Sequence, residues 1–246
     1  MTLSRQELLD LVERMPAFPA SVHRIIELTN DVNCQARDLL AVIDTDPVLT
    51  MRILKVANSA YFGLQNPILS VKHAVVYIGL NTVKHLALAT AAIGAIPTDE
   101  TTGLDTETYL RHSLGAGIVC RRLGQRVHID HHGTADLFVA GLLHDIGKVV
   151  FASFEPTSFR AAVELAELTG CKDFQAEYQI FGSDHAELGG LLASKWDFPH
   201  ELARAIAEHH QPVVYDTATP LRDVVYLASA IMPVSYTHLR AHETSI

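Results

Sequence analysis

Apolar residues recur at intervals of three and four along nearly all of this 246-residue chain. Leu39, Leu40 and Ile43 show the pattern, and Leu49 and Ile53 continue it. This spacing places apolar side chains on one face of an α-helix, whereas a half-buried strand would alternate at every second residue. The chain is therefore predicted to be all-α.

One segment interrupts the helical pattern completely. Residues 97–102 read Pro-Thr-Asp-Glu-Thr-Thr and precede Gly103, so this stretch is polar and breaks helices. We place a boundary there, which divides the chain into an N-terminal helical part, residues 1–100, and a second helical bundle, residues 101–233. Residues 234–246 resemble a translated cloning adaptor, and we leave this non-native tail out of the fold.

A histidine-aspartate doublet, His144-Asp145, lies inside an apolar stretch that is predicted to be one buried helix over residues 140–150. An unpaired carboxylate in such a place would cost several kcal/mol, so the doublet needs a partner. A divalent metal is one candidate, because imidazole nitrogen and carboxylate oxygen are its ordinary ligands. The alternative is a core histidine that is hydrogen-bonded to its neighbours.

Further histidines fall on other predicted helices and favour the metal. His112 lies in an apolar helical pattern, His185 in the first turn of another helix, and His209-His210 at the end of a third. Adjacent residues on a helix point about 100° apart, so a doublet can bracket two metals, or one metal and a phosphate. His131 and His132, by contrast, are predicted to lie in a solvated loop.

Several longer segments carry a resemblance to a known family. The ordered histidines and the doublet look like the HD superfamily of metal-dependent phosphohydrolases, and the first half is similar to its HDOD subgroup. The segments that carry the HDOD resemblance are residues 46–49, 53–63, 68–75, 181–182, 184–189 and 195–199. The likeness extends over approximately residues 15 to 232.

The resemblance implies two packed helical bundles, the second of them HD-like, in a bacterial signal-transduction output module. Such modules are joined to, or act on, regulatory domains and other signalling proteins. The metal ligands implied are His112, His144, Asp145, His185, His209 and His210. They would hold one or two ions of iron, manganese or zinc.

The alternative implied by the resemblance is a metal-dependent phosphohydrolase acting on a nucleotide or a cyclic dinucleotide. Asp145 and Lys148 would then be the catalytic residues, and Lys148 would help to bind a phosphate. Catalytic relatives place an aspartate in a late helix where this chain has Ser229, and Asp223 is a poor substitute at six residues' distance. Relatives that cleave cyclic dinucleotides carry a Gly-Tyr-Pro segment that this chain lacks after His210. The sequence leaves open whether the chain is an enzyme.

Two residues near the doublet and His185 have competing interpretations. Lys148 is either the phosphate-binding cation or a helix-terminal cation that interacts favourably with the helix dipole. Asp184 is either a helix N-cap, which we favour, or an acceptor that orients the neighbouring imidazole.

Composition excludes several classes of protein. Hydrophobic residues make up 48% and charged residues 19% of the chain, which is typical of a globular fold. The net charge of −9, without a basic run, disfavours nucleic-acid binding. Three scattered cysteines form no disulfide framework, so a cytoplasmic location is expected. The apolar run over residues 86–96 is about half of what a membrane span needs. The oligomeric state stays open.

Overall fold

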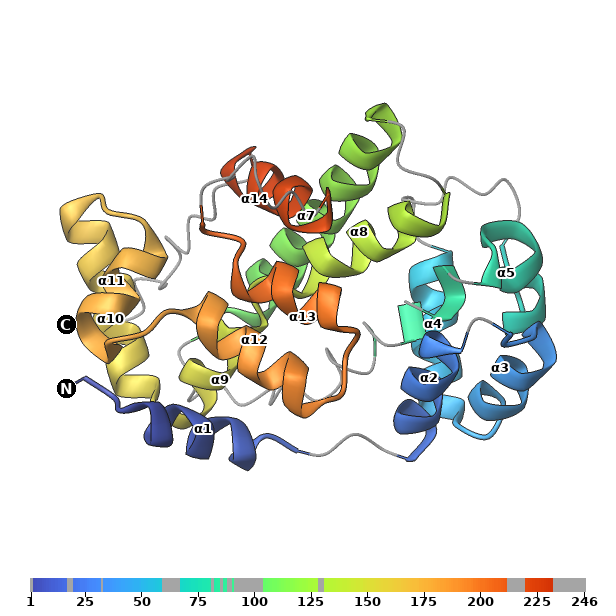
Figure 1. Ribbon diagram of the computed structural model, residues 1–246, viewed down its shortest axis with the longest axis horizontal. Coiled ribbons are helices and arrows are strands. Elements are labelled where there is room, and N and C mark those ends of the chain that lie inside the picture. Colours follow the sequence, from blue (N-terminus) through green and yellow to red (C-terminus); the bar gives the residue numbers. More distant parts are fainter. Residues whose placement is uncertain are drawn as a thin grey trace, which may run out of the picture.

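The computed structural model describes residues 2–16, 20–31, 33–58, 67–80, 82–84, 86–87, 90, 104–127, 131–211 and 220–231. Within these ranges every regular element is a helix, which confirms the predicted all-α class. The helices gather into two groups that lie side by side along the long axis of the molecule (Figure 1).

The N-terminal group is the smaller of the two and is drawn in blue to teal (Figure 1). It contains α2 (Ala20–Asn30), α3 (Ala36–Ile43), α4 (Pro47–Ala57) and α5 (Val71–Ile78). Its core is apolar, with Leu39, Ile43 and Ile53 fully buried. Asn58 is the C-cap residue of α4. Its side-chain amide donates to the Ile68 carbonyl at 2.7 Å and accepts from the Ile68 N–H at 2.6 Å, which joins the end of α4 to the segment before α5.

Side-chain caps explain where two of these helices begin. Ser70 Oγ accepts from the His73 N–H at the start of α5. Asp46 precedes Pro47 at the start of α4, and its carboxylate accepts from the Leu49 N–H at 3.0 Å. The same carboxylate accepts from the Ser21 hydroxyl of α2 at 2.8 Å, so this cap also joins two helices.

Replacing Asp46 with alanine is expected to lower the free energy of unfolding by about 1 kcal/mol at neutral pH, the usual cost of losing an N-cap. The Leu49 N–H lowers the pKa of Asp46 from its ordinary value of 3.8. The difference between parent and variant should therefore be complete above that value and disappear as the pH falls through the lowered pKa. Urea unfolding at several pH values measures it, and a pH-independent difference would contradict this account.

The second group, which we call the C-terminal bundle, holds the remaining helices. They are α7 (Thr106–Arg126), α8 (His131–Leu143), α9 (Ile146–Phe154), α10 (Pro156–Thr169), α11 (Asp173–Phe181), α12 (His185–Lys195), α13 (His200–Ala207) and α14 (Pro220–Ile231). Figure 1 shows α7, α8, α12 and α13 at its centre, with α10 and α11 at the end far from the N-terminal group.

Helix α1 (Arg5–Arg14) packs on the C-terminal bundle although it precedes the N-terminal group in sequence. The Lys195 ammonium of α12 donates to the carbonyls of Val12 and Glu13 at the end of α1, at 3.0 and 2.8 Å. The predicted boundary near residue 100 and the predicted adaptor tail, residues 234–246, lie outside the described residues. Both stay predictions.

The single buried helix predicted through the doublet is wrong, because His144 and Asp145 form a turn between α8 and α9. On one straight helix the two side chains would point about 100° apart. The turn lets both reach the same cluster, while the flanking residues Leu143 and Ile146 stay buried. A second correction concerns His131 and His132, which begin α8 rather than lying in a loop.

The predicted apolar run over residues 86–96 lies largely outside the described residues. Among the described residues, Leu137–Phe154 is apolar and long enough to cross a membrane by composition, with a mean hydropathy of 1.6. However, 89% of this stretch is buried inside the fold, as in the core helix of a globular bundle.

Candidate metal centre

Four separate parts of the C-terminal bundle converge on one buried point. His112 comes from the second turn of α7, and His144-Asp145 from the turn after α8. His185 is the first residue of α12, and His209-His210 lies in the turn after α13. All but His210 are buried, and His210 is half-buried. The six predicted ligands form two triads, and within each triad the donor atoms lie within 4.8 Å of one another. The first triad is His112, His144 and Asp145, and the second is His185, His209 and His210.

The Asp145 carboxylate lies between the two triads. Its Oδ1 is 3.2 Å from His144 Nε2, 3.0 Å from His185 Nε2 and 3.7 Å from His209 Nε2. Its Oδ2 is 3.6 Å from His112 Nε2. Both carboxylate oxygens thus face imidazole nitrogens, and Oδ1 faces members of both triads, so Asp145 could serve as a ligand for one or two metal ions.

Three of the imidazoles are oriented through their Nδ1 atoms. His144 Nδ1 lies 2.7 Å from the Gly141 carbonyl, and His209 Nδ1 lies 2.7 Å from the Ile206 carbonyl. A carbonyl can only accept, so both Nδ1 atoms carry hydrogen, and in the neutral rings both Nε2 atoms present a lone pair to the cluster. His185 is held in the same way by a carboxylate, described below.

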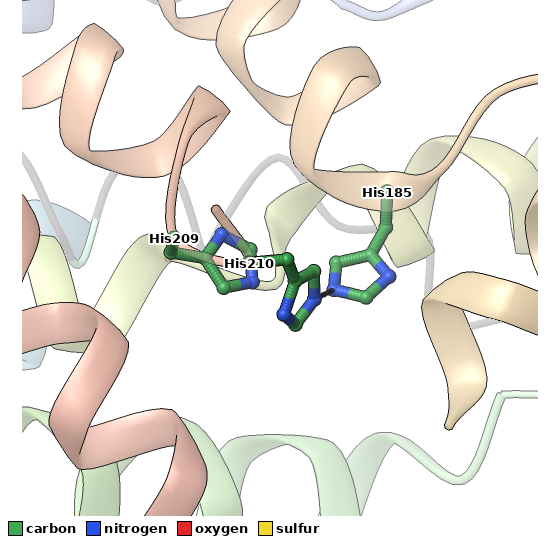
Figure 2. A group of neighbouring side chains, drawn as sticks. All are labelled: His185, His209 and His210. Carbon is green, nitrogen blue, oxygen red and sulfur yellow. Dashed lines mark hydrogen bonds between the residues drawn. The ribbon is translucent and has the colours of Figure 1, made fainter. Parts of the chain in front are cut away.

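One of these inward nitrogens has no donor among the described residues. His209 Nε2 is buried and has no hydrogen-bond partner there. His112 Nε2 and His144 Nε2 approach each other to 3.3 Å, and His185 Nε2 and His210 Nε2 approach to 2.9 Å, as Figure 2 shows for the second pair. Nitrogen lone pairs and a carboxylate that converge in this way fit a cation, and their types fit a divalent transition metal.

The electrostatics keep most of these imidazoles neutral. Burial, the largest influence, lowers the pKa of His112 to about 4 and lowers the pKa values of His144 and His209 as well. Burial and the adjacent His209 imidazole likewise lower the pKa of His210. Neutral imidazole is the form that binds metal, so these rings are ready as ligands at neutral pH.

His185 and Asp145 differ from this pattern. Burial is the largest influence on His185 and opposes its charge, but nearby carboxylates outweigh burial and raise its pKa to about 9. Burial also opposes the charge of Asp145, but the surrounding positive groups hold the pKa of that carboxyl well below its usual range. Asp145 is therefore an anion, and a cation, either a proton or a metal ion, is favoured at His185 Nε2.

Lys148 is buried and lies in the first turn of α9. A cation stabilises a helix dipole at the C-terminal end, so Lys148 does not have that role in α9. Its ammonium forms two ion pairs of 3.0 Å, one with Asp145 Oδ2 and one with Asp173 Oδ2 of α11. A phosphate that approached this ammonium from the cavity would share it with the two carboxylates.

Sequence reasoning missed the contribution of α11. Glu177 is buried, and its Oε2 accepts from both the backbone N–H and Nδ1 of His185. The Phe174 ring stacks on the His210 imidazole, with centroids 4.3 Å apart. One signal could have revealed Glu177: it occupies the inward face of α11, one turn before the buried Phe181, where an apolar residue is expected.

Asp184 is an N-cap, as predicted, because its carboxylate accepts from the Glu187 N–H at 2.9 Å. The carboxylate that orients His185 through Nδ1 is Glu177, one helix earlier. Asp223 accepts two hydrogen bonds from Arg222 and does not line the site.

A cavity of about 320 Å³ opens onto the cluster. Its floor includes His112, Asp145 and His185, and Phe174 of α11 and Tyr226 of α14 contribute to its walls. Ser229 lies in the wall formed by α14, and its hydroxyl donates to the Tyr226 carbonyl at 2.9 Å. Catalytic relatives are expected to have an aspartate at the position of Ser229. In this chain that position lines the cavity with a hydroxyl group instead of a carboxylate.

Residues 15–212 match the HDOD domain family. This chain belongs to that family. The HDOD match covers the whole N-terminal group and most of the C-terminal bundle, including all six candidate ligands.

Three solved structures with the same fold carry three different descriptions. A candidate phosphohydrolase from Shewanella amazonensis SB2B is 27% identical, with a TM-score of 0.78 over 92% of this chain and 79% of its own. An HDOD domain protein of unknown function from Geobacter sulfurreducens is 26% identical, with a TM-score of 0.75 over 92% and 78%. A candidate signal transduction protein from Marinobacter aquaeolei VT8, 23% identical with a TM-score of 0.74 over 91% and 53%, shares the fold.

A curated relative from Treponema pallidum (strain Nichols), an uncharacterized protein, is 27% identical over 223 residues. The match covers 89% of this chain but only 42% of that relative, so the HDOD chain spans less than half of its length.

Proposed function

We propose that this chain is a regulatory output module of bacterial signal transduction and that its C-terminal bundle binds one or two divalent transition-metal ions, with iron, manganese or zinc as candidates. The buried His209 Nε2, which has no hydrogen-bond partner among the described residues, carries the proposal. It faces a cluster in which other Nε2 lone pairs and an anionic carboxylate also converge. A buried polar atom normally has a partner, and a metal ion supplies one.

Regulation rather than turnover is supported by the cavity walls. Ser229 replaces the carboxylate that would complete the site, and Asp223 is paired with Arg222. Lys148 is already neutralised by two carboxylates. A metal here would stabilise the bundle in the manner of a structural site, and signalling proteins or fused regulatory domains would be its partners. The three free cysteines fit a cytoplasmic location.

A metal-dependent phosphohydrolase is the second candidate, because the cavity reaches the cluster from the surface. A bound metal pair would polarise a phosphoryl group and lower the pKa of a coordinated water. In this chain Asp145 would hold the metal, and Lys148 would exchange Asp173 for a phosphate oxygen. The candidate substrates are nucleotides and cyclic dinucleotides.

Hydrolysis assays separate the two candidates. The metal-replete parent is incubated with nucleotides, cyclic dinucleotides and bis-p-nitrophenyl phosphate, beside the His144→Ala/Asp145→Ala variant. A regulatory module should show no turnover above the variant with any of them. Turnover by the parent that the double substitution abolishes would overturn the module in favour of the enzyme.

The Ser229→Asp variant should bind metal more tightly than the parent, by roughly tenfold, because it places a carboxylate in the cavity wall beside the cluster. Competition with a fluorescent chelator measures the affinity. Ser153→Ala is the matched control, since Ser153 also donates its hydroxyl to a carbonyl of its own helix but does not line the cavity. Equal affinity in the parent and Ser229→Asp would show that this wall does not limit the site.

A further inference from the structure

Glu177 is a buried carboxylate that accepts two hydrogen bonds from one residue, His185. Its Oε2 accepts from the His185 backbone N–H at 2.8 Å and lies 2.5 Å from His185 Nδ1. Only 3% of the Glu177 residue surface is exposed. A buried carboxylate is costly unless it is well paired, so this arrangement fixes the position of the ring as well as that of the first residue of α12.

The other oriented imidazoles have weaker acceptors. His144 and His209 each donate Nδ1–H to a backbone carbonyl three residues earlier. His185 donates to a carboxylate that belongs to a different helix. A carboxylate partner fixes the tautomer, aims Nε2 and makes that nitrogen a stronger ligand than a carbonyl partner does.

Two more contacts join α11 to the same cluster. The Asp173 carboxylate pairs with Lys148 at 3.0 Å, and the Phe174 ring stacks on His210 at an interplanar angle of 20°. Asp173 and Phe174 begin the helix, and Glu177 lies one turn later. Helix α11 therefore contacts His185 of α12, His210 after α13, and Lys148 of α9, which itself pairs with Asp145.

We infer that Glu177 is a positioning residue for the metal centre, which holds His185 Nε2 toward Asp145 and couples the docking of α11 to metal binding. This inference rests on the proposed metal centre. Glu177 itself does not line the cavity and belongs to neither triad of candidate ligands. It acts through the imidazole whose Nδ1–H it accepts.

Metal affinity tests the positioning role. Zn²⁺ and Mn²⁺ are titrated into the metal-free parent and into Glu177→Ala, Glu177→Gln and Phe181→Leu. Loss of a partner that orients a ligand typically costs roughly 10–100-fold in affinity, and we expect this for Glu177→Ala. Glu177→Gln should recover part of the loss, because an amide oxygen can accept both hydrogen bonds without the charge.

Phe181→Leu is the control for general damage to α11. Phe181 is buried on the same helix and stacks on Phe151, with ring centroids 4.0 Å apart, but does not contact the cluster. It should lower stability and leave the affinity within about twofold of the parent. If Phe181→Leu and Glu177→Ala lose affinity equally, Glu177 is merely structural and the inference fails.

A measurement on metal-free protein separates this inference from the proposed function. In ¹H–¹⁵N spectra of the histidine rings, the parent and Phe181→Leu should show a protected downfield proton on His185 Nδ1, and Glu177→Ala should lose it. If the parent binds no metal but shows this proton, the metal centre fails while the orientation of His185 stands. If Glu177→Ala keeps the proton, the positioning role is overturned whatever the metal result.

The coupling to α11 has a readout of its own, because linkage between two events is reciprocal. Zn²⁺ should slow amide hydrogen exchange in α11 of the parent, and the effect should be lost in Glu177→Ala. Exchange in α11 that does not respond to Zn²⁺ in the parent, under conditions where Zn²⁺ binds, would contradict the coupling.

Discussion

The Gly147→Ala variant is expected to lose about 3 kcal/mol or more of its free energy of unfolding, at the upper end of what overpacking costs in a core. A Cβ on Gly147 would lie 2.0 Å from the His185 carbonyl oxygen and 2.8 Å from the Gly189 nitrogen. Both are backbone atoms of α12, so α9 and α12 would have to separate. That movement would also displace His185 from the cluster.

Gly189→Ala on the facing helix is the matched control. Its Cβ would meet the Ile206 methyl group at 3.0 Å, which can move, and the Gly147 backbone nitrogen at 3.2 Å, a far milder contact than the 2.0 Å approach at Gly147. Urea unfolding of the two variants should therefore show a clearly smaller loss for Gly189→Ala. If Gly147→Ala were as stable as the parent, the close approach of α9 and α12 would be wrong.

Replacing Asp145 with alanine is expected to abolish metal binding and to destabilise the metal-free protein by about 3 kcal/mol, since removing one partner of a buried ion pair leaves the other charge uncompensated. Lys148 and His185 both contact this carboxylate, at 3.0 Å, and both are buried. Urea unfolding and metal titration of the same preparations measure the two effects.

The control is Asp173→Ala, which removes the outer carboxylate of the Lys148 pair. The Asp173 side chain is 34% exposed, so its ion pair is screened and should contribute less than about 1 kcal/mol. Asp173→Ala should also keep its metal. Equal losses in the two variants would mean that Asp145 has no special place in the cluster.

Much of the fold and most of the candidate site follow from local sequence patterns. Periodic apolar residues predicted the all-α class, and Asp184 marked a helix start because an N-cap is local chemistry. The six histidine and aspartate side chains stood out because polar residues on apolar faces need partners. Their convergence from four parts of the chain is a finding of the structure.

What the sequence did not reveal depends on tertiary contacts. The turn at His144-Asp145 lies in an unbroken apolar run, so periodicity had no reason to end the helix there. Gly147 has an ordinary helical environment in sequence, and its need to be glycine comes from α12. Glu177 was detectable in principle as a charge on the inward face of a helix, but its partner His185 is known only from the fold.

The metal content of the purified protein tests the central claim most directly. Protein prepared without a chelating tag is analysed by elemental analysis beside two variants. One is His144→Ala/Asp145→Ala, and the other is His200→Ala, whose side chain is 86% exposed and belongs to neither triad. The account predicts about one to two equivalents of a transition metal in the parent and in His200→Ala, and none in the double variant. A parent without metal, even after reconstitution with iron, manganese or zinc, would contradict it.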